Sequence, residues 1–187
     1  MTTCQNRKPQ IGVMGSAADL KYNTDIERLA FEVGALLAEK GAITVYGAEK
    51  DYDSLSTAAA RGAKSKNGLT VGVTYGKGKD VFDTKGNTDV IVVTGLERGG
   101  GREFVLVNSC DALIIISGGS GTLTEAAIAY QLNIPVVALV GTGGWADKLA
   151  GTYIDNRKRF KVLSAQTPAE AVTTALLLVA EYAARKK

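Results

Sequence analysis

Histidine is absent from this sequence of 187 residues. Imidazole is the usual proton carrier near neutral pH and a frequent zinc ligand, so its absence excludes Ser-His-Asp triads, histidine general acid–base catalysis and most zinc sites. Cysteine is almost as scarce. Cys4 and Cys110 provide no disulfide framework, which favours a reducing compartment, and we expect a cytoplasmic protein.

Long apolar runs are also missing. No stretch approaches the roughly 20 residues of a transmembrane helix, and the N-terminus shows no apolar signal region. We therefore expect no membrane contact. The net charge is only +3, and the basic residues are spread along the chain, so a nucleic-acid partner is not expected either.

Glycine, in contrast, is frequent, with 22 residues against 3 prolines. Between the glycines, continuously apolar segments alternate with segments of helical periodicity. Continuous apolarity is typical of strands buried on both faces of a parallel sheet. The expected strands are residues 10–14, 42–46, 69–74, 89–93, 111–116 and 135–140. The expected helices are residues 24–40, 54–66, 102–109, 122–132 and 167–184, with residues 145–160 helical in pieces.

This alternation predicts a single α/β domain over residues 9–187, behind an N-terminal tail of residues 1–8. Its fold would be a parallel sheet of six to seven strands with helices on both faces. Three Thr-x-x-Glu sequences predict capping boxes at helix starts. They are Thr24 with Glu27, Thr122 with Glu125, and Thr167 with Glu170.

The most informative segment is the glycine-rich turn at residues 117–121, between a predicted buried strand and a predicted helix. Such a turn exposes backbone N–H groups at the positive end of a helix dipole, where anions bind. The segment matches neither a P-loop nor the G-x-G-x-x-G fingerprint. It predicts a phosphate cradle and an ordinary capped helix about equally well. The candidate ligand-binding residues here are Gly118, Gly119, Ser120, Gly121, Thr122 and Glu125.

Three further residues are candidates for the same ligand site. Gly15 and Ser16 form the turn after the first predicted strand, and ligands of open α/β sheets bind beyond the carboxyl ends of the strands. Arg102 follows three glycines and begins a predicted helix. Its guanidinium would clamp a phosphate, or would form a surface ion pair with Glu103 or Glu97. Asp111, Asp147 and Glu125 are too scattered to predict a metal site, and the sequence requires no cofactor.

Residues 117–125 resemble the Pro-Gly-Gly-x-Gly-Thr-x-x-Glu motif of the LOG-type, "lysine decarboxylase-like" Rossmann superfamily, with serine in place of proline. Arg102 precedes Glu125 by 23 residues, the spacing of the arginine and glutamate in LOG phosphoribohydrolases. Within the superfamily the chain is most similar to the small branch of molybdenum cofactor carrier proteins. The segments that carry this likeness are residues 7–15, 61–64, 69–73, 94–96 and 141–149. The resemblance implies a Rossmann-like fold and a homodimer or tetramer.

One segment departs from the family pattern. Relatives carry a glycine-rich second loop that helps to hold phosphate, whereas residues 46–56 here keep one glycine and are acidic and aromatic. Acidic groups repel phosphate, so either this loop swings away or the ligand differs. Glu103 also replaces the lysine that adjoins the arginine in LOG enzymes.

Two functions are compatible with these residues. The first is a binding or carrier protein for a small phosphorylated, nucleotide-like ligand, with the molybdenum cofactor as a candidate. The alternative is a LOG-like phosphoribohydrolase that cleaves the N-glycosidic bond of nucleoside 5′-monophosphates, with Arg102 and Glu125 as catalytic residues. A lysine decarboxylase is excluded, because no site for a pyridoxal cofactor is evident.

Overall fold

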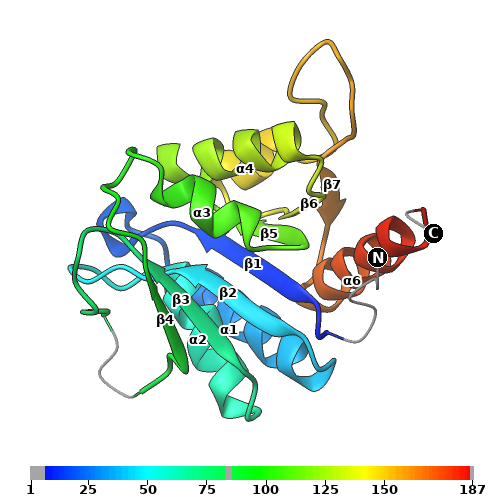
Figure 1. Cartoon of the computed structure of the whole chain (residues 1–187). Coiled ribbons are helices and arrows are strands. Elements are labelled where there is room, and N and C mark those ends of the chain that lie inside the picture. Colours follow the sequence, from blue (N-terminus) through cyan, green and yellow to red (C-terminus); the bar gives the residue numbers. More distant parts are fainter. Residues whose placement is uncertain (1–6, 83–85, 186–187) are drawn as a thin grey trace.

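The computed structural model describes residues 7–82 and 86–185. Its centre is one parallel sheet of seven strands in the order β4-β3-β2-β1-β5-β6-β7 (Figure 1). The strands are β1 Gln10–Gly15, β2 Ile43–Gly47, β3 Thr70–Thr74, β4 Val90–Val93, β5 Ala112–Ile116, β6 Val136–Leu139 and β7 Leu163–Ala165. The predicted parallel sheet of six to seven strands is confirmed. Strand β7 is the one whose position the apolar runs did not predict.

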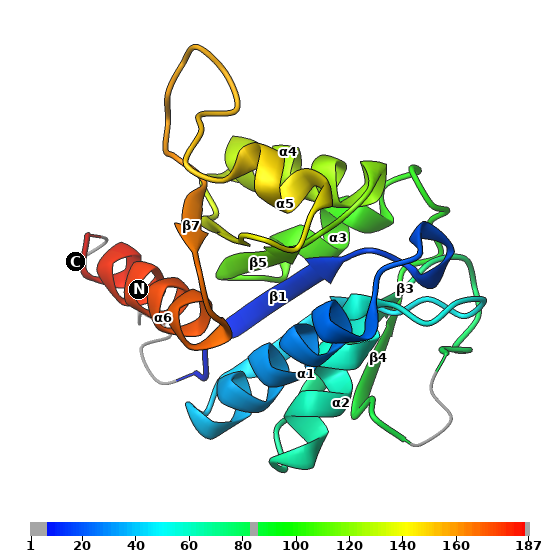
Figure 2. The same ribbon diagram turned by 180° about the vertical axis from the view of Figure 1, so that it is seen from behind.

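Helices cover both faces of the sheet, as predicted (Figures 1 and 2). The helices are η1 Ala18–Leu20, α1 Thr24–Glu39, α2 Leu55–Ser65, α3 Arg102–Asn108, α4 Ser120–Leu132, α5 Gly144–Leu149 and α6 Pro168–Arg185. Helices α1, α2 and α6 contribute to one apolar core, and α3, α4 and α5 to the other. Along β5, Ile114 and Ile116 belong to the first core, and Leu113 and Ile115 to the second. This alternation explains why the strand is apolar at every position.

The capping predictions have mixed outcomes. Helix α6 begins at Pro168, and Glu170 N donates to Thr167 Oγ1 at 3.2 Å, so this start is confirmed. The cap of α1 is Asn23, whose side chain accepts from Ile26 N; Thr24 is already helical, and its predicted role as the cap is wrong. The reason is that Asn23 offers an equally good acceptor one residue earlier.

The segment from residue 145 to residue 160 is less helical than the sequence predicts. Helix α5 ends at Leu149, and the chain then forms a projecting loop that a bridge between Tyr153 and Lys161 closes. Tyr130 Oη donates to Asp155 and accepts from Arg159 N, which fixes this loop against α4. Among the described residues, no helix has the length and apolarity needed to cross a membrane.

The strand order reverses between β1 and β5. From β1 the chain builds the sheet outward through β2, β3 and β4, and from β5 it builds the other half through β6 and β7. The register places Gly15 beside Ile116, so the turns after these two strands leave the sheet side by side in opposite directions. A crevice at such a switch point is where open α/β sheets bind ligands.

Candidate functional site

A cavity of about 230 Å³ lies at this switch point. Loops that follow β1, β2 and β5 meet there with η1, α3 and α4. The lining residues are Gly15, Ser16, Ala17, Asp19, Leu20, Gly47, Glu49, Ser54, Ser56, Arg98, Arg102, Glu103, Gly119, Ser120, Gly121, Thr122 and Glu125. All the ligand-binding residues predicted from the sequence, except Gly118, therefore line one cavity.

Gly118 has a structural role in the turn instead. Its N–H donates to Ser16 Oγ at 2.9 Å, and the Ser16 hydroxyl donates to Ser117 Oγ at 3.1 Å. Gly118 has φ +101°, and a Cβ there would lie 2.5 Å from Thr122. The turn after β5 is thus tied to the turn after β1, and the Gly118 N–H is already used within the protein.

The first turn of α4 faces the same cavity. The helix begins at Ser120, its cap residue is Gly119, and no side chain within the described residues caps it. The predicted cap at Thr122 is therefore wrong, because the helix starts two residues earlier. The first N–H groups of an uncapped helix lack helical partners and carry the positive end of the dipole. Ser120, Gly121 and Thr122 thus present anion-binding geometry to the cavity.

Arg102 is the most unusual side chain of the site. It is the first residue of α3 yet is only 4% exposed, so the alternative of a surface ion pair with Glu103 or Glu97 is wrong. Its Nη2 donates to Glu49 Oε1 at 2.8 Å, whereas its Nε has no hydrogen-bond partner in the described structure. Gly47 makes room for it, because a Cβ there would lie 2.2 Å from Arg102 Nη1. A buried guanidinium with an unused hydrogen-bond donor is suited to bind an anion.

Glu49 belongs to the acidic loop after β2 and is the site residue that sequence reasoning missed. One carboxylate oxygen accepts from Arg102 and the other from Arg98. Arg98 also lies over the Tyr75 ring, 4.9 Å from its centroid. The signal in the sequence is the acidity of residues 46–56, which marks a departure from the family pattern but does not indicate an arginine partner.

Glu125 lies behind Arg102 on α4. Its Oε1 is 3.9 Å from Arg102 Nη1, too far for a hydrogen bond. Burial raises the pKa of Glu125 to about 8; Arg102 opposes this increase, and Glu103 and Glu49 add to it. At neutral pH the group is therefore mostly protonated and neutral.

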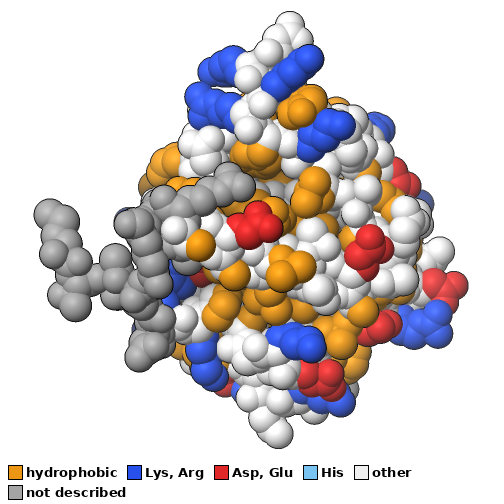
Figure 3. Space-filling view, turned by 90° about the vertical axis from the view of Figure 1, so that its right-hand side faces the viewer, with side chains coloured by type: hydrophobic (Ala, Val, Ile, Leu, Met, Phe, Trp, Pro, Cys, Tyr) orange, Lys and Arg blue, Asp and Glu red, His pale blue; other side chains and the backbone are white. Residues whose placement is uncertain are grey.

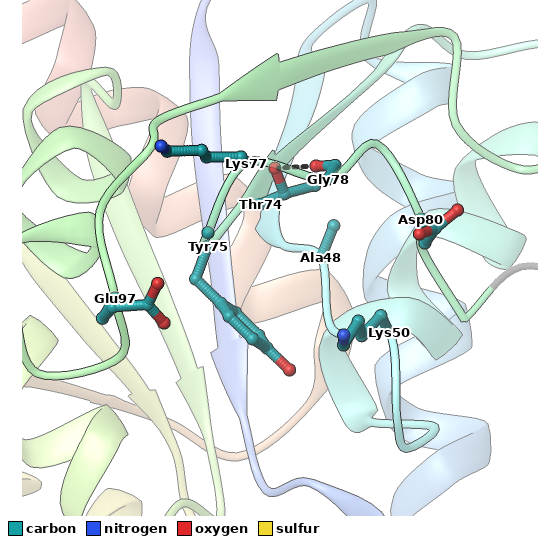
Figure 4. A pocket seen from close by; sticks show the side chains of 9 residues that line it. Ala48, Lys50, Thr74, Tyr75, Lys77, Gly78, Asp80 and Glu97 are labelled. Atoms are coloured by element: carbon teal, nitrogen blue, oxygen red, sulfur yellow. Dashed lines mark hydrogen bonds between the residues drawn. The ribbon is translucent and has the colours of Figure 1, made fainter.

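A second cavity, of about 170 Å³, adjoins the first across the loop after β2 (Figure 4). Its charged lining residues are Lys50, Lys77, Asp80 and Glu97. In Figure 4 Lys77 points away from Tyr75 and Lys50, and the four charged groups do not converge on one point. This cavity alone does not form an anion site.

Metal ligands do not gather at either cavity. Within the described residues, no group of three or more Cys, Asp or Glu side chains lies close enough to hold a metal ion. Asp111 pairs with Arg7, and Asp147 accepts from the Gly141 and Gly143 N–H groups. Cys110 is buried just before β5 begins, at the opposite end of that strand from Ser117. Burial also raises the pKa of its thiol well above the usual range.

Comparison with known proteins identifies the family. A family model described as the SLOG cluster4 family matches residues 8–172. The match spans most of the chain, and the chain belongs to this family.

Three relatives illustrate its neighbourhood. An uncharacterised protein of Archaeoglobus fulgidus is 37% identical over 130 residues, which cover 70% of this chain and 79% of the relative. The structure of a molybdenum cofactor carrier protein from Chlamydomonas reinhardtii is 31% identical, with a TM-score of 0.76, and covers 93% of this chain and 99% of its own. The molybdenum cofactor binding protein of Rippkaea orientalis is 27% identical, with a TM-score of 0.75 and the same coverage. The likeness to the carrier branch that the sequence predicts is confirmed.

Proposed function

We propose that this SLOG cluster4 protein binds and carries a small phosphorylated, nucleotide-like ligand at the switch-point cavity, and that the molybdenum cofactor is the first ligand to test. The observation that carries the proposal is Arg102, a buried arginine with an unpartnered Nε beside the uncapped start of α4. Together they offer a guanidinium and backbone N–H groups to a phosphate. Two structural neighbours are named as molybdenum cofactor carrier or binding proteins.

The donor set fits the phosphate end of the molybdenum cofactor rather than its metal end. Arg102, Arg98 and the N–H groups of residues 120–122 would hold the phosphate. Within the described residues no thiol lines the cavity, and no group of three or more Cys, Asp or Glu side chains is placed to hold a metal ion. The molybdenum would therefore keep the ligands of its own pterin, and the protein would supply recognition and shelter.

The test is to produce the protein in cells that make the molybdenum cofactor and to analyse the purified protein for molybdenum and pterin by mass spectrometry. Arg102→Ala should lower the bound amount by about tenfold or more, because it removes the charged donors. Arg28→Ala is the matched control, since Arg28 is exposed on α1 and its ion pair within the described residues is with Asp25. Equal loading of all three proteins would contradict the proposal.

The phosphoribohydrolase alternative has a separate test. In this alternative Glu125 stabilises an oxocarbenium-like state, a role that needs an ionised carboxylate, whereas burial raises the pKa of Glu125 to about 8 and so opposes its ionisation at pH 7. We therefore expect no release of adenine and ribose 5-phosphate when the protein is incubated with AMP. Turnover of AMP that disappears in both Arg102→Ala and Glu125→Ala would show that the protein is a phosphoribohydrolase rather than a carrier.

We also propose that the chain works as a homo-oligomer, a dimer or tetramer, in the cytoplasm. The small residues of α2 do not provide the contact between copies, because they are buried within the chain and α2 packs closely against α1. Exposed apolar side chains provide other support. Leu177 of α6 is 60% exposed, and Figure 3 shows hydrophobic side chains gathered across the face that carries α6. Multi-angle light scattering at several protein concentrations measures the mass.

A further inference from the structure

The end of β2 and the loop that follows it separate the two cavities, because successive residues line alternate sides. Gly47 and Glu49 line the cavity at the switch point, whereas Ala48 and Lys50 line its neighbour. On the far side the wall continues with Arg98, which lies over Tyr75 and donates to its hydroxyl at 3.2 Å. Two carboxylates hold the loop to this wall: Glu49 accepts from Arg98 and Arg102, and Asp51 accepts from the Tyr75 hydroxyl.

Glu49 occupies the position that an anionic ligand needs. Its two oxygens are spent on Arg102 and Arg98, the arrangement in which two oxygens of a phosphate would be held. The Glu49 side chain is 12% exposed and that of Arg102 is 5% exposed, so this carboxylate is not merely a solvated surface group. A dianionic phosphate cannot share the arginines with it, since like charges repel at this distance.

The size of the cavity also indicates that Glu49 must move before a ligand of nucleotide size binds. About 230 Å³ is below the 300–1,000 Å³ typical of small-molecule sites. Movement of the whole loop that carries Glu49, and not of its side chain alone, would join this space to the cavity of about 170 Å³ beyond the loop. The joined crevice would have the phosphate donors at one end and the face of Tyr75 along its wall.

We propose that Glu49 is an internal counter-ion whose carboxylate is exchanged for the phosphate of the ligand, and that a phosphate monoester dianion drives this exchange whereas a neutral nucleoside does not. The inference rests on the proposed phosphate site at Arg102 and deepens it. A monoester phosphate carries nearly two negative charges at pH 7 and three acceptor oxygens, enough to satisfy both arginines and displace one carboxylate. A neutral nucleoside lacks the charge to do so.

The test uses AMP and adenosine as probes, with wild type, Glu49→Gln and Asp51→Asn. Titration calorimetry measures the affinities. The fluorescence of Trp145 gives a second signal, because the backbone N–H of Trp145 donates to Gly118 O at 3.0 Å and so ties this residue to the turn beside the cavity. Glu49→Gln should bind AMP about tenfold tighter or more than wild type, since it removes the competing charge from two arginines. Its affinity for adenosine should be unchanged.

Asp51→Asn is the matched control. It removes the same charge from the same loop, but Asp51 contacts the Tyr75 hydroxyl rather than an arginine, and its affinity for AMP should remain within about twofold of wild type. Glu49→Ala provides a second variant if Glu49→Gln does not fold, and thermal unfolding checks both.

The outcomes are distinguishable. Equal AMP binding by wild type and Glu49→Gln overturns the role of Glu49 and leaves the phosphate site standing. Weaker binding by Glu49→Gln also overturns it, because Glu49 would then merely position Arg102. If Asp51→Asn gains as much affinity for AMP as Glu49→Gln does, the effect comes from the total charge of the loop, and the exchange is overturned. No AMP binding by any variant removes the phosphate site and, with it, the proposed function.

Discussion

At the crevice, burial determines the protonation and the ion pairing of single residues more than the residue type does. Glu125 shows this most clearly. Its sequence context is that of an ordinary capping glutamate, yet α4 starts early enough to put it in the second turn, where it is buried behind Arg102. The sequence predicted which residues gather at the site, but neither the protonation of Glu125 nor the Glu49 bridge, because both depend on how segments distant in sequence pack.

The raised pKa of Glu125 predicts a pH-dependent stability. The folded state keeps a proton that the unfolded state, with a pKa near 4.5, releases. The free energy of unfolding should therefore be highest below about pH 5 and fall as pH rises to about 8, on the order of 1 kcal/mol per pH unit. Urea denaturation at a series of pH values measures it.

The absence of histidine makes this profile easy to interpret, because few other groups titrate between pH 5 and 8. Glu125→Gln mimics the protonated form and should flatten the profile, whereas Glu32→Gln, the same change at an exposed position of α1, should leave the slope intact. A wild-type curve that is already flat over this range would show that Glu125 is ionised in the folded protein.

Ser117 predicts a second effect at this scale. The LOG-type motif has proline at this position, but Ser117 has φ +55° and donates its N–H to Thr142 Oγ1 at 2.8 Å. Proline fixes φ near −65° and has no N–H. Ser117→Pro should therefore lower the free energy of unfolding by about 3 kcal/mol or more, and Ser117→Gly by less than about 1 kcal/mol. Similar denaturation midpoints for the two variants would contradict this account.

At the scale of helices and strands, one feature not deduced from the sequence is the close approach of α1 and α2. Both helices carry a glycine at the crossing. A Cβ on Gly34 would lie 1.8 Å from Ala59 O, and one on Gly62 would lie 1.8 Å from Phe31 O. These glycines have no distinctive local pattern, since helical periodicity describes the face of one helix and says nothing about its distance from the next.

Gly34→Ala should lower the free energy of unfolding by about 3 kcal/mol, because the added methyl group has no room against the α2 backbone. This loss outweighs the gain of up to about 1 kcal/mol that alanine provides over glycine in a helix. Gly121→Ala is the control: Gly121 is also helical, and its Cβ would meet no atom within 4 Å. Chemical denaturation of both variants checks the difference, and equal stabilities would refute the close crossing.

At the scale of the whole molecule, the sequence predicted the architecture well because burial on both faces leaves a strong pattern in β1, β5 and β6. It failed where the pattern is weak. Strand β7 has three residues and one exposed side chain, and the chain between α5 and β7 is held by Tyr130 and Asp155, a contact without a local signature. The order of strands, which creates the crevice, was not predicted, because no single segment carries a signal for its neighbours in the sheet.

The exposed face of α6 predicts how copies of the chain associate. Leu177→Glu should convert the proposed oligomer to a monomer, because a buried unpaired carboxylate at a contact is costly. Phe104→Glu, an equivalent change at the exposed Phe104 of α3, should leave the mass unchanged. Light scattering distinguishes the variants, and dissociation by Phe104→Glu alone would place the contact on α3.

The hydrogen bond from Gly118 to Ser16 joins residues that lie 102 positions apart in the chain. During synthesis the first half of the sheet, from β1 to β4, emerges long before the turn after β5 exists. The ligand site forms only after residues 16 and 118 have come together, which requires the closure of a long loop. A ligand therefore cannot assist the early steps of folding. Ligand binding should slow unfolding of the finished protein far more than it accelerates refolding, and the crevice is among the last parts of this molecule to form.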